Sequence, residues 1–423
     1  MTSDAIGTAA DPAAWNRRLQ ATIAVLCGAV FLDAMDGSTV NIALPSIGSS
    51  LGLSASSLQW VVSGYVLGYG GFLLLGGRAS DLLGRRKVFL AAVLIFALAS
   101  CLGGFAQSGA MLIAARGIKG VAAAFTVPAG LSILTTTFPE GPARNKALGA
   151  YGVAAALGFV FGLVVGGLLA ELGWRWVFFA PAPVGMLIAF AGARVLIRDP
   201  ERAAGPRHFD ALGALTVTGS MVALVYTVVE APARGWLGGA TLGGFAAAAL
   251  LLAAFVVIEG RSPQPLVRMD IFRNLDLLSA DIAGTLFFGS FLAFLFIATL
   301  YVQDVAGWSP IATAVAFAAM GPFLPILGGR AEMLIGRFGT GRLVALALVC
   351  FAVGFGLFAR EQSGTLDYVT MMLPSMIAIG LGWGFGFPAL NVRATAGVPD
   401  KDQGLAAGLL NTGLQIGGAI GVA

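Results

Sequence analysis

The sequence is short of charge. Of its 423 residues only 11% are Asp, Glu, Lys or Arg, whereas 58% are hydrophobic and the mean hydropathy is +0.88. So few polar residues cannot cover the surface of a soluble protein of this length, which excludes a soluble globular domain. Apolar runs of roughly 20 residues, the length that a helix needs to cross a bilayer, recur along the chain. The composition therefore predicts an all-α integral membrane protein.

Cysteine and histidine are also scarce. Cys27, Cys101 and Cys350 fall in three different apolar runs, and the sole histidine, His208, lies in a polar loop. We expect neither a disulfide nor a metal site, because these residues show no paired or clustered spacing. The longest loops carry no nucleophile–base pair and no phosphate-binding motif. This disfavours a membrane-embedded enzyme and a pump that hydrolyses ATP by itself.

The net charge of +4 follows membrane topology rather than forming a nucleic-acid-binding patch. Basic residues gather in alternate loops, and the loops between them hold few. This is the positive-inside pattern, and it predicts a multi-pass protein with a cytoplasmic N-terminus. The base-rich loops contain Arg17 and Arg18; Arg78, Arg85, Arg86 and Lys87; Arg144 and Lys146; Arg198, Arg202 and Arg207; Arg261, Arg268 and Arg273; Arg330, Arg337 and Arg342; and Lys401.

Hydropathy predicts thirteen membrane spans. The last predicted span ends inside an apolar helix at Ala423, so we expect a final helix to be missing from this chain. The spans are predicted at 20–44, 58–78, 88–107, 110–135, 147–170, 176–196, 211–230, 238–258, 277–301, 310–329, 343–359, 368–390 and 403–423.

Internal repetition divides these spans into two sets. The motif Gly-Gly-Arg-Ala occurs at 76–79 and again at 328–331, and glycines of the fifth span recur at nearly the same offset in the thirteenth. Two six-helix repeats around an extra helix pair produce this spacing, an architecture of many secondary transporters. We therefore expect an N-terminal six-helix bundle at 1–200, two inserted linker helices at 201–265 and a C-terminal bundle at 266–423 with five of its six helices present.

The segment GGRASDLLGRRKVF, at 76–89, joins the second and third predicted spans. A glycine permits a tight turn, and the acid can pair with the bases or the bases with lipid headgroups. The segment resembles the loop signature of the major facilitator superfamily, in which acid and arginines form a latch that opens and closes as the two halves rock. A topology anchor alone is the alternative. The resemblance implies as latch residues Gly77, Asp81, Gly84, Arg85 and Arg86.

Further motifs resemble the fourteen-span drug:proton antiporters of that superfamily, over essentially the whole chain. The resemblance implies alternating access, a bacterial inner membrane, a proton gradient in place of a cofactor, and function as a monomer. The matching residues are Met35 to Pro45 in the first span; Arg116, Gly117 and Gly120 in the fourth; Trp174, Arg175, Trp176, Phe178, Phe179, Pro183 and Gly185 in the sixth; and Asn411, Thr412, Gln415, Gly417 and Gly418 in the thirteenth.

Three positions depart from the family pattern. Leu163 takes the proline position of the fifth-span antiporter motif GxxxGPxxGG, Lys119 stands where a glutamine is usual, and Pro181 stands where an asparagine is usual. These departures keep two alternatives open: a proton-coupled importer or facilitator, and an exporter of one specific metabolite or antibiotic. The motif's glycines, which the resemblance assigns to a gating helix, are kept at Gly158, Gly162, Gly166 and Gly167.

Two acids, Asp33 and Asp36, lie within the first predicted span. An ionised carboxylate at mid-bilayer costs about 2.5–3.5 kcal/mol, so both need partners, protons or water. At a rise of about 1.5 Å per residue, Asp36 lies at the same depth in the membrane as Arg116 of the fourth span, and Asp33 at the same depth as Lys119. Because the resemblance implies that the first and fourth spans are adjacent, this predicts a ladder of two ion pairs. Asp36, at the family's acid position, is the predicted proton carrier, and a permanent network that only fixes helix packing is the alternative.

Other polar and aromatic residues within the spans are candidates for a substrate cavity. For the phenylalanine-rich ninth span, lipid contact or helix packing is the alternative. The family resemblance, together with the acids, implies a proton-coupled exporter of hydrophobic or cationic drugs. The candidates are Asn41, Tyr65, Asp281, Phe288, Gln303, Asn391, Asn411 and Gln415.

Overall fold

The computed structural model describes residues 17–138, 141–197, 211–262, 267, 269–360, 367–399 and 403–423. Among these residues there is no β-strand, and thirteen helical segments are long and apolar enough to cross a membrane. This confirms the predicted all-α membrane fold. His208 and the basic residues at 198, 202, 207, 268 and 401 lie outside the described residues.

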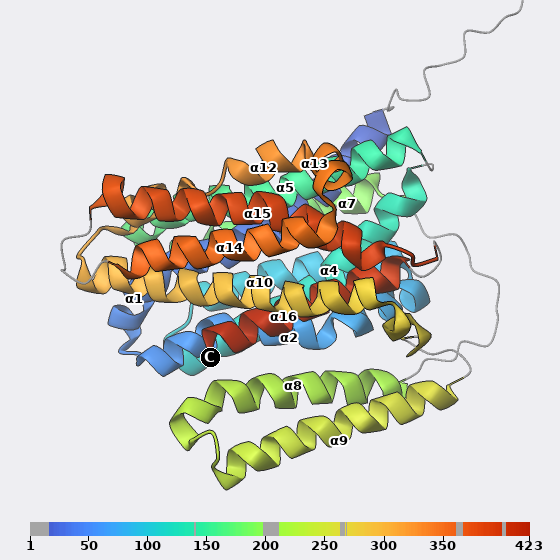
Figure 1. Cartoon of the computed structure of the whole chain (residues 1–423), viewed down its shortest axis with the longest axis horizontal. Helices are drawn as coiled ribbons and strands as arrows, with labels where there is room; N and C mark the ends of the chain where they lie inside the picture. Colours follow the sequence, from blue (N-terminus) through green and yellow to red (C-terminus); the bar gives the residue numbers. More distant parts are fainter. Residues whose placement is uncertain are drawn as a thin grey trace, which may run out of the picture.

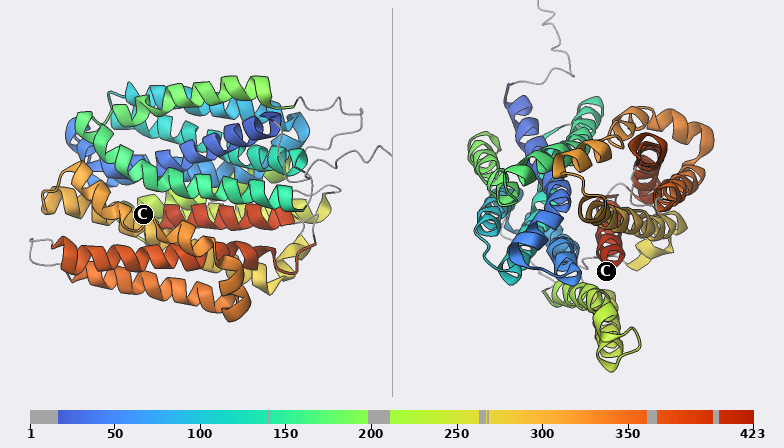
Figure 2. Two further views of the ribbon diagram at one scale, coloured as in Figure 1. Left: turned by 90° about the horizontal axis from the view of Figure 1, so that it is seen from above. Right: turned by 90° about the vertical axis from the view of Figure 1, so that its left-hand side faces the viewer.

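The first six spans form one bundle, seen on the left when the helices are viewed end-on (Figure 2, right). In it α2 packs along α4, α1 along α5, and α3 along both α4 and α7. Pro181 opens α7 at a position where a missing N–H costs nothing, which accounts for the break after α6. The helices are α1 (Arg17–Leu51), α2 (Ala55–Leu83), α3 (Arg85–Gly104), α4 (Gly109–Thr137), α5 (Pro142–Leu172), α6 (Trp176–Phe179) and α7 (Pro181–Val195).

The inserted pair consists of α8 (Ala211–Arg234) and α9 (Gly239–Arg261). The two helices form a hairpin beside the main body of the molecule (Figure 1). α8 packs on α2 and on the last described helix, α16 (Gln403–Val422), whereas α9 packs mainly on α8. The hairpin therefore covers a line along which the two bundles meet.

The remaining spans form the second bundle. α10 packs along α16, and α14 packs along α15. The short helices α11 and α12 together make one span. The elements are η1 (Met269–Arg273), α10 (Leu275–Leu300), η2 (Tyr301–Val305), α11 (Pro310–Ala318), α12 (Phe323–Gly328), α13 (Ala331–Phe338), α14 (Thr340–Ala359), η3 (Tyr368–Met372), α15 (Leu373–Thr395) and α16.

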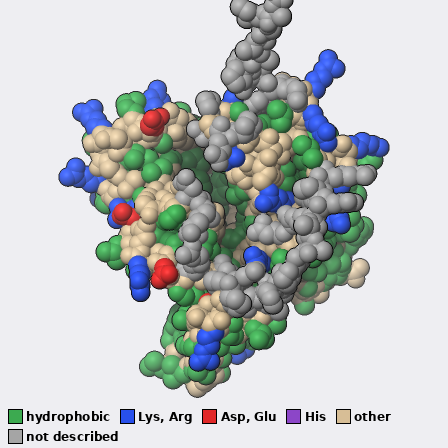
Figure 3. All heavy atoms as spheres, turned by 90° about the vertical axis from the view of Figure 1, so that its right-hand side faces the viewer, with side chains coloured by type: hydrophobic (Ala, Val, Ile, Leu, Met, Phe, Trp, Pro, Cys, Tyr) green, Lys and Arg blue, Asp and Glu red, His purple; other side chains and the backbone are tan. Residues whose placement is uncertain are grey.

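The two ends of the molecule differ. At the end where α1 begins, here named the basic end, Lys and Arg side chains surround a hollow lined by apolar side chains (Figure 3). Toward the opposite end α5 packs against α11, where a Cβ on Gly167 would lie 2.6 Å from the Ala314 Cβ. There too the Gln303 amide donates a hydrogen bond of 2.9 Å to the Ile42 carbonyl. The structure is thus open at the basic end and closed at the other.

Candidate functional site

A buried charge cluster lies between α1 and α4. Asp36 and Lys119 have no exposed surface, and the Arg116 side chain is 2% exposed. Arg116 Nη1 donates to Asp36 Oδ2 at 2.5 Å, and Lys119 Nζ donates to Asp36 Oδ1. Both oxygens of one carboxylate are therefore held by cations.

Neighbouring helices satisfy the two cations further. Arg116 Nε donates to the Val61 carbonyl of α2 at 3.1 Å, and the guanidinium lies 4.3 Å from the centre of the Tyr65 ring. Lys119 Nζ donates to Ser100 Oγ of α3 at 2.9 Å and lies 4.6 Å from the centre of the Phe96 ring. Each buried cation thus has a carboxylate, a neutral acceptor and an aromatic face, which offset the cost of removing it from water.

Glycines bring α2 close enough to α4 for these contacts. A Cβ on Gly120 would lie 2.0 Å from the Tyr65 carbonyl oxygen, and one on Gly68 would lie 2.4 Å from the Gly117 carbonyl oxygen. Small residues allow such close backbone approach between membrane helices. The glycines that follow Arg116 in the sequence therefore place α2 where its carbonyl and its tyrosine ring meet the arginine.

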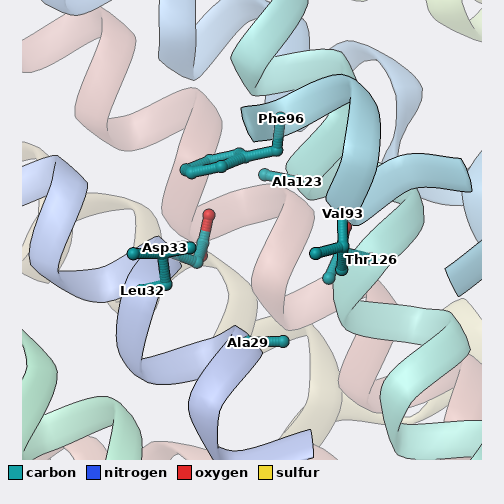
Figure 4. A pocket seen from close by; sticks show the side chains of 7 residues that line it. All are labelled: Ala29, Leu32, Asp33, Val93, Phe96, Ala123 and Thr126. Carbon is teal, nitrogen blue, oxygen red and sulfur yellow. The ribbon is translucent and has the colours of Figure 1, made fainter. Parts of the chain in front are cut away.

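The second acid has different surroundings. The Tyr65 hydroxyl donates to Asp33 Oδ1, and Asp33 is partly exposed. Its carboxylate points into a small cavity between α1, α3 and α4 (Figure 4). The cavity has a volume of about 10 Å³, enough for about one water molecule. Ala29, Leu32, Val93, Phe96, Ala123 and Thr126 complete the lining.

The predicted ladder is half correct. The contact of Asp36 with Arg116 is confirmed, but the contact of Asp33 with Lys119 is wrong, because Lys119 binds Asp36 and Asp33 bonds to Tyr65. Counting residues gave the level of each side chain along its helix but not its direction around it. Arg116 and Lys119 are three residues apart on one face of α4, so both long side chains reach a single carboxylate.

The gating-helix glycines lie where α5 meets its neighbours. A Cβ on Gly158 would lie 2.4 Å from the Phe31 carbonyl oxygen, and one on Gly162 would lie 2.2 Å from Ser38 Oγ. Gly166 approaches α1 in the same way, whereas Gly167 faces α11 of the other bundle. α5 is therefore in close backbone contact with both halves, and its role as a gate stays a prediction.

The latch residues are only partly described. Gly84 has φ +103°, which favours glycine, and forms the turn between α2 and α3. The Arg86 side chain donates to the Ala193 carbonyl of α7. A Cβ on Gly77 would meet only Pro128, at 3.9 Å, whereas one on Gly76 would lie 2.1 Å from a backbone oxygen of α4. The side chain of Asp81 lies outside the description, so its pairing with Arg85 or Arg86 stays a prediction.

The predicted cavity residues occupy several different places. Tyr65 belongs to the charge cluster, and Gln303 links the halves at the closed end. Gln415 lies beside Gly70 of α2, where the two bundles meet. Asp281 Oδ1 is buried with no hydrogen-bond partner in the described part of the chain. Amide hydrogen bonds to the preceding turn of their own helices are made by Asn41, Asn391 and Asn411.

An aromatic cluster in the second bundle combines phenylalanines of the predicted ninth span with Trp383 of α15, which was not predicted. The centre of the Trp383 indole lies 4.9 Å from the ring centre of Phe291, 5.0 Å from that of Phe287 and 6.2 Å from that of Phe288, all on α10. Phe288 is one of the predicted cavity residues. Phe159 of α5 reaches the same indole from the first bundle, at 6.5 Å. The alternation of glycine with aromatic residues in GWGFGF, at 382–387, could have revealed it, because the glycines admit neighbouring helices.

Known proteins resemble the chain over most of its length. The family model described as Major Facilitator Superfamily matches residues 26–422. The puromycin resistance protein pur8 of Streptomyces alboniger is 39% identical over 406 residues, which are 95% of this chain and 80% of that protein. The cephamycin export protein CmcT of Amycolatopsis lactamdurans is 35% identical over 407 residues, 95% of this chain and 83% of that protein.

A solved structure has the same fold. The POT family transporter PepTSo matches with a TM-score of 0.71 at 18% identity, over 96% of this chain and 88% of that one. The sequence motifs, the paired bundles and these matches agree. The chain therefore belongs to the major facilitator superfamily, and it is a membrane transporter rather than an enzyme.

Proposed function

We propose that this transporter exports hydrophobic, antibiotic-like compounds from a bacterial cell in exchange for protons. The names of its relatives, a resistance protein and an export protein for natural antibiotics, support this direction and this class of substrate. They favour an exporter of one or a few antibiotics over an importer on the same fold.

The distribution of charge supports an orientation. Because basic loops are retained in the cytoplasm, the basic end and the N-terminus face the cytoplasm. The family resemblance supports a location in the inner membrane and function as a monomer. The hollow at the basic end then receives substrate from the cytoplasm or the inner leaflet (Figure 3). Rocking of the two bundles closes this hollow and separates α5 from α11 at the other end.

The observation that carries proton coupling is the charge cluster inside the membrane. Ionisable residues within membrane spans are expensive, and replacing a buried ion pair by apolar residues often leaves stability unchanged or higher. Helix packing alone therefore explains poorly why four charged side chains lie between α1 and α4. Binding and release of protons by the carboxylates explains their presence better.

The test uses inside-out vesicles from an efflux-deficient bacterium, in which respiration acidifies the interior. A proton-coupled exporter releases protons from the interior when puromycin, a cephamycin or ethidium is added, and a fluorescent pH probe reports the change. Vesicles without the protein and vesicles with Asp304→Asn, an exposed acid outside the cluster, serve as controls. Transport of these compounds without proton release would contradict proton coupling.

A further inference from the structure

We propose that Asp33, and not Asp36, takes up and releases the transported proton, while Asp36 remains ionised as the fixed counter-ion of Arg116 and Lys119. This inference rests on the proposed function and deepens it. It differs from the expectation drawn from the family resemblance, which places the proton on Asp36.

Asp36 is poorly placed to bind a proton. Its two oxygens accept from Arg116 and Lys119, and the residue has no exposed surface through which water could deliver a proton. Protonation would leave both buried cations without a negative partner, which is strongly destabilising when one member of a buried ion pair is lost. Its geometry is that of a structural counter-ion.

Asp33 has the opposite surroundings. Its hydrogen bond comes from the neutral hydroxyl of Tyr65, and its carboxylate borders a cavity large enough for about one water molecule. Apart from the Thr126 hydroxyl, the side chains that line this cavity with it are apolar (Figure 4). Asp33 can therefore exchange a proton with water without leaving a buried cation unpaired.

The charges around Asp33 are compatible with both its ionised and its protonated form. On its own helix the nearest is Asp36, and α4 presents the cations Arg116 and Lys119. Among the described residues, α2 and α5 contribute the neutral phenols Tyr65, Tyr69 and Tyr151, which interact with it, and the cavity residues of α3 are apolar. With both acids ionised, the two carboxylates balance the two cations. A proton on Asp33 gives the cluster one net positive charge.

Tyr65 links the proton site to the contact between the bundles. Its hydroxyl donates to Asp33, while its ring packs on the guanidinium of Arg116. It belongs to α2, whose Gly70 lies against Gln415 of α16 in the second bundle. Proton binding forms an O–H bond on the Asp33 carboxylate and removes the negative charge to which the Tyr65 hydroxyl donates. The hydrogen bond between Tyr65 and Asp33 changes as a result, and it changes on α2, the helix that contacts both bundles.

The test is infrared difference spectroscopy of the purified full chain during a pH titration, without any transported compound. A protonated carboxyl gives a C=O stretching band that an ionised one lacks. The other carboxyls of the chain give such bands as well, so the diagnostic signal is the difference between the unaltered protein and Asp33→Asn. We expect one titrating C=O band, the Asp33 band, to be present in the unaltered protein, lost in Asp33→Asn and returned at a shifted position in Asp33→Glu. Identical titrating bands in the unaltered protein and in Asp33→Asn would overturn the inference.

Two further variants separate the two acids. Asp36→Asn combined with Lys119→Met removes one charge of each sign, so this double variant should keep both the fold and the Asp33 band. Loss of the band in this double variant, with the band retained in Asp33→Asn, would assign the proton to Asp36. Tyr65→Phe is expected to move the midpoint of the band to higher pH, because the ionised form of Asp33 loses its donor.

The vesicle assay then distinguishes failure of this inference from failure of the proposed function. If unaltered protein releases protons on addition of puromycin and Asp33→Asn still does so, proton coupling stands and Asp33 is the wrong residue. If Asp33 titrates in the infrared but the unaltered protein transports without moving protons, the proposed coupling is wrong while the assignment of the titrating group stands.

Discussion

The two bundles use one packing scheme to hold two kinds of interior. In the first, Gly162 of α5 lies against Met35 of α1, and in the second, Gly421 of α16 lies against Gly289 of α10. Counting from these glycine contacts, Asp36 corresponds to Ser290 and Asp33 to Phe287. The first interior is therefore charged where the second is aromatic, with Phe287 and Phe291 packed on Trp383.

The comparison separates scaffold from function. Glycine contacts fix how closely the paired helices approach, and they leave the side chains on neighbouring faces free to differ. The first bundle uses this freedom for ionisable groups that are costly in a membrane. The second uses it for rings that fill space and form part of the wall between the bundles. In the proposed function, proton coupling belongs to the first half and substrate contact to the second.

The largest effect is expected for Asp36→Asn. Both buried cations lose their negative partner, so the folded state should be destabilised by about 3–5 kcal/mol. The measurement is the yield of monodisperse protein after heating, followed by size-exclusion chromatography. Ser290→Ala at the corresponding position of α10 is the control, because it removes only a hydrogen bond to the Phe287 carbonyl. Normal stability of Asp36→Asn with loss of transport alone would indicate that Asp36 exchanges a proton.

The glycine contacts predict similar losses in both halves. Gly162→Ala puts a methyl group 2.5 Å from the Met35 carbonyl oxygen, and Gly421→Ala puts one 2.0 Å from the Gly289 carbonyl oxygen. Each should cost about 1–3 kcal/mol, because the paired helices must move apart. Thermal unfolding measures this cost. Gly152→Ala and Gly408→Ala, in the same two helices but with nothing within 4 Å, should change little. Loss in only one half would contradict a shared packing scheme.

A smaller and more selective effect is expected for Trp383→Phe. The change keeps an aromatic ring in the cluster but shortens its reach toward Phe159 of the first bundle, so stability should fall by about 0.5–1.5 kcal/mol. Susceptibility of an efflux-deficient strain should shift between puromycin and ethidium, while proton release with the better compound remains. Phe190→Leu, an exposed position on α7, is the control. An equal loss for all compounds would argue that Trp383 serves folding alone.

Much of the fold could be predicted from the sequence because its determinants are local. Spans depend on runs of apolar residues, and the repeat is visible in the spacing of glycines. Once the family resemblance places the first and fourth spans side by side, the pairing of Asp36 with Arg116 could also be predicted, since buried opposite charges at one depth attract. The spans and the depths of these charges follow from composition and from distance along one helix axis.

The rest depended on rotation and on partners far apart in the sequence. The choice of Asp36 by Lys119 is set by the direction in which α4 faces α1, and the bond of Tyr65 to Asp33 is set by the position of α2. Ser100, which accepts a hydrogen bond from Lys119, carries no distinguishing signal in an apolar segment. The small cavity beside Asp33 results from side chains of three helices and has no local pattern.

The smallest effect is expected at the contact between the α8–α9 hairpin and the first bundle. Trp60 of α2 donates to Glu230 of α8 at 3.0 Å, and Glu230 also pairs with Arg234 at 3.0 Å. Both charged side chains are partly exposed, so Glu230→Gln should cost less than about 1 kcal/mol in thermal unfolding. Glu332→Gln, an exposed acid on α13, is the matched control.

Because the hydrogen bond between Trp60 and Glu230 joins α8 to the first bundle, a cysteine cross-link between α8 and α2 should leave transport intact. A cross-link between α8 and α16 should block transport. Block by both cross-links would show that the hairpin moves independently of the first bundle.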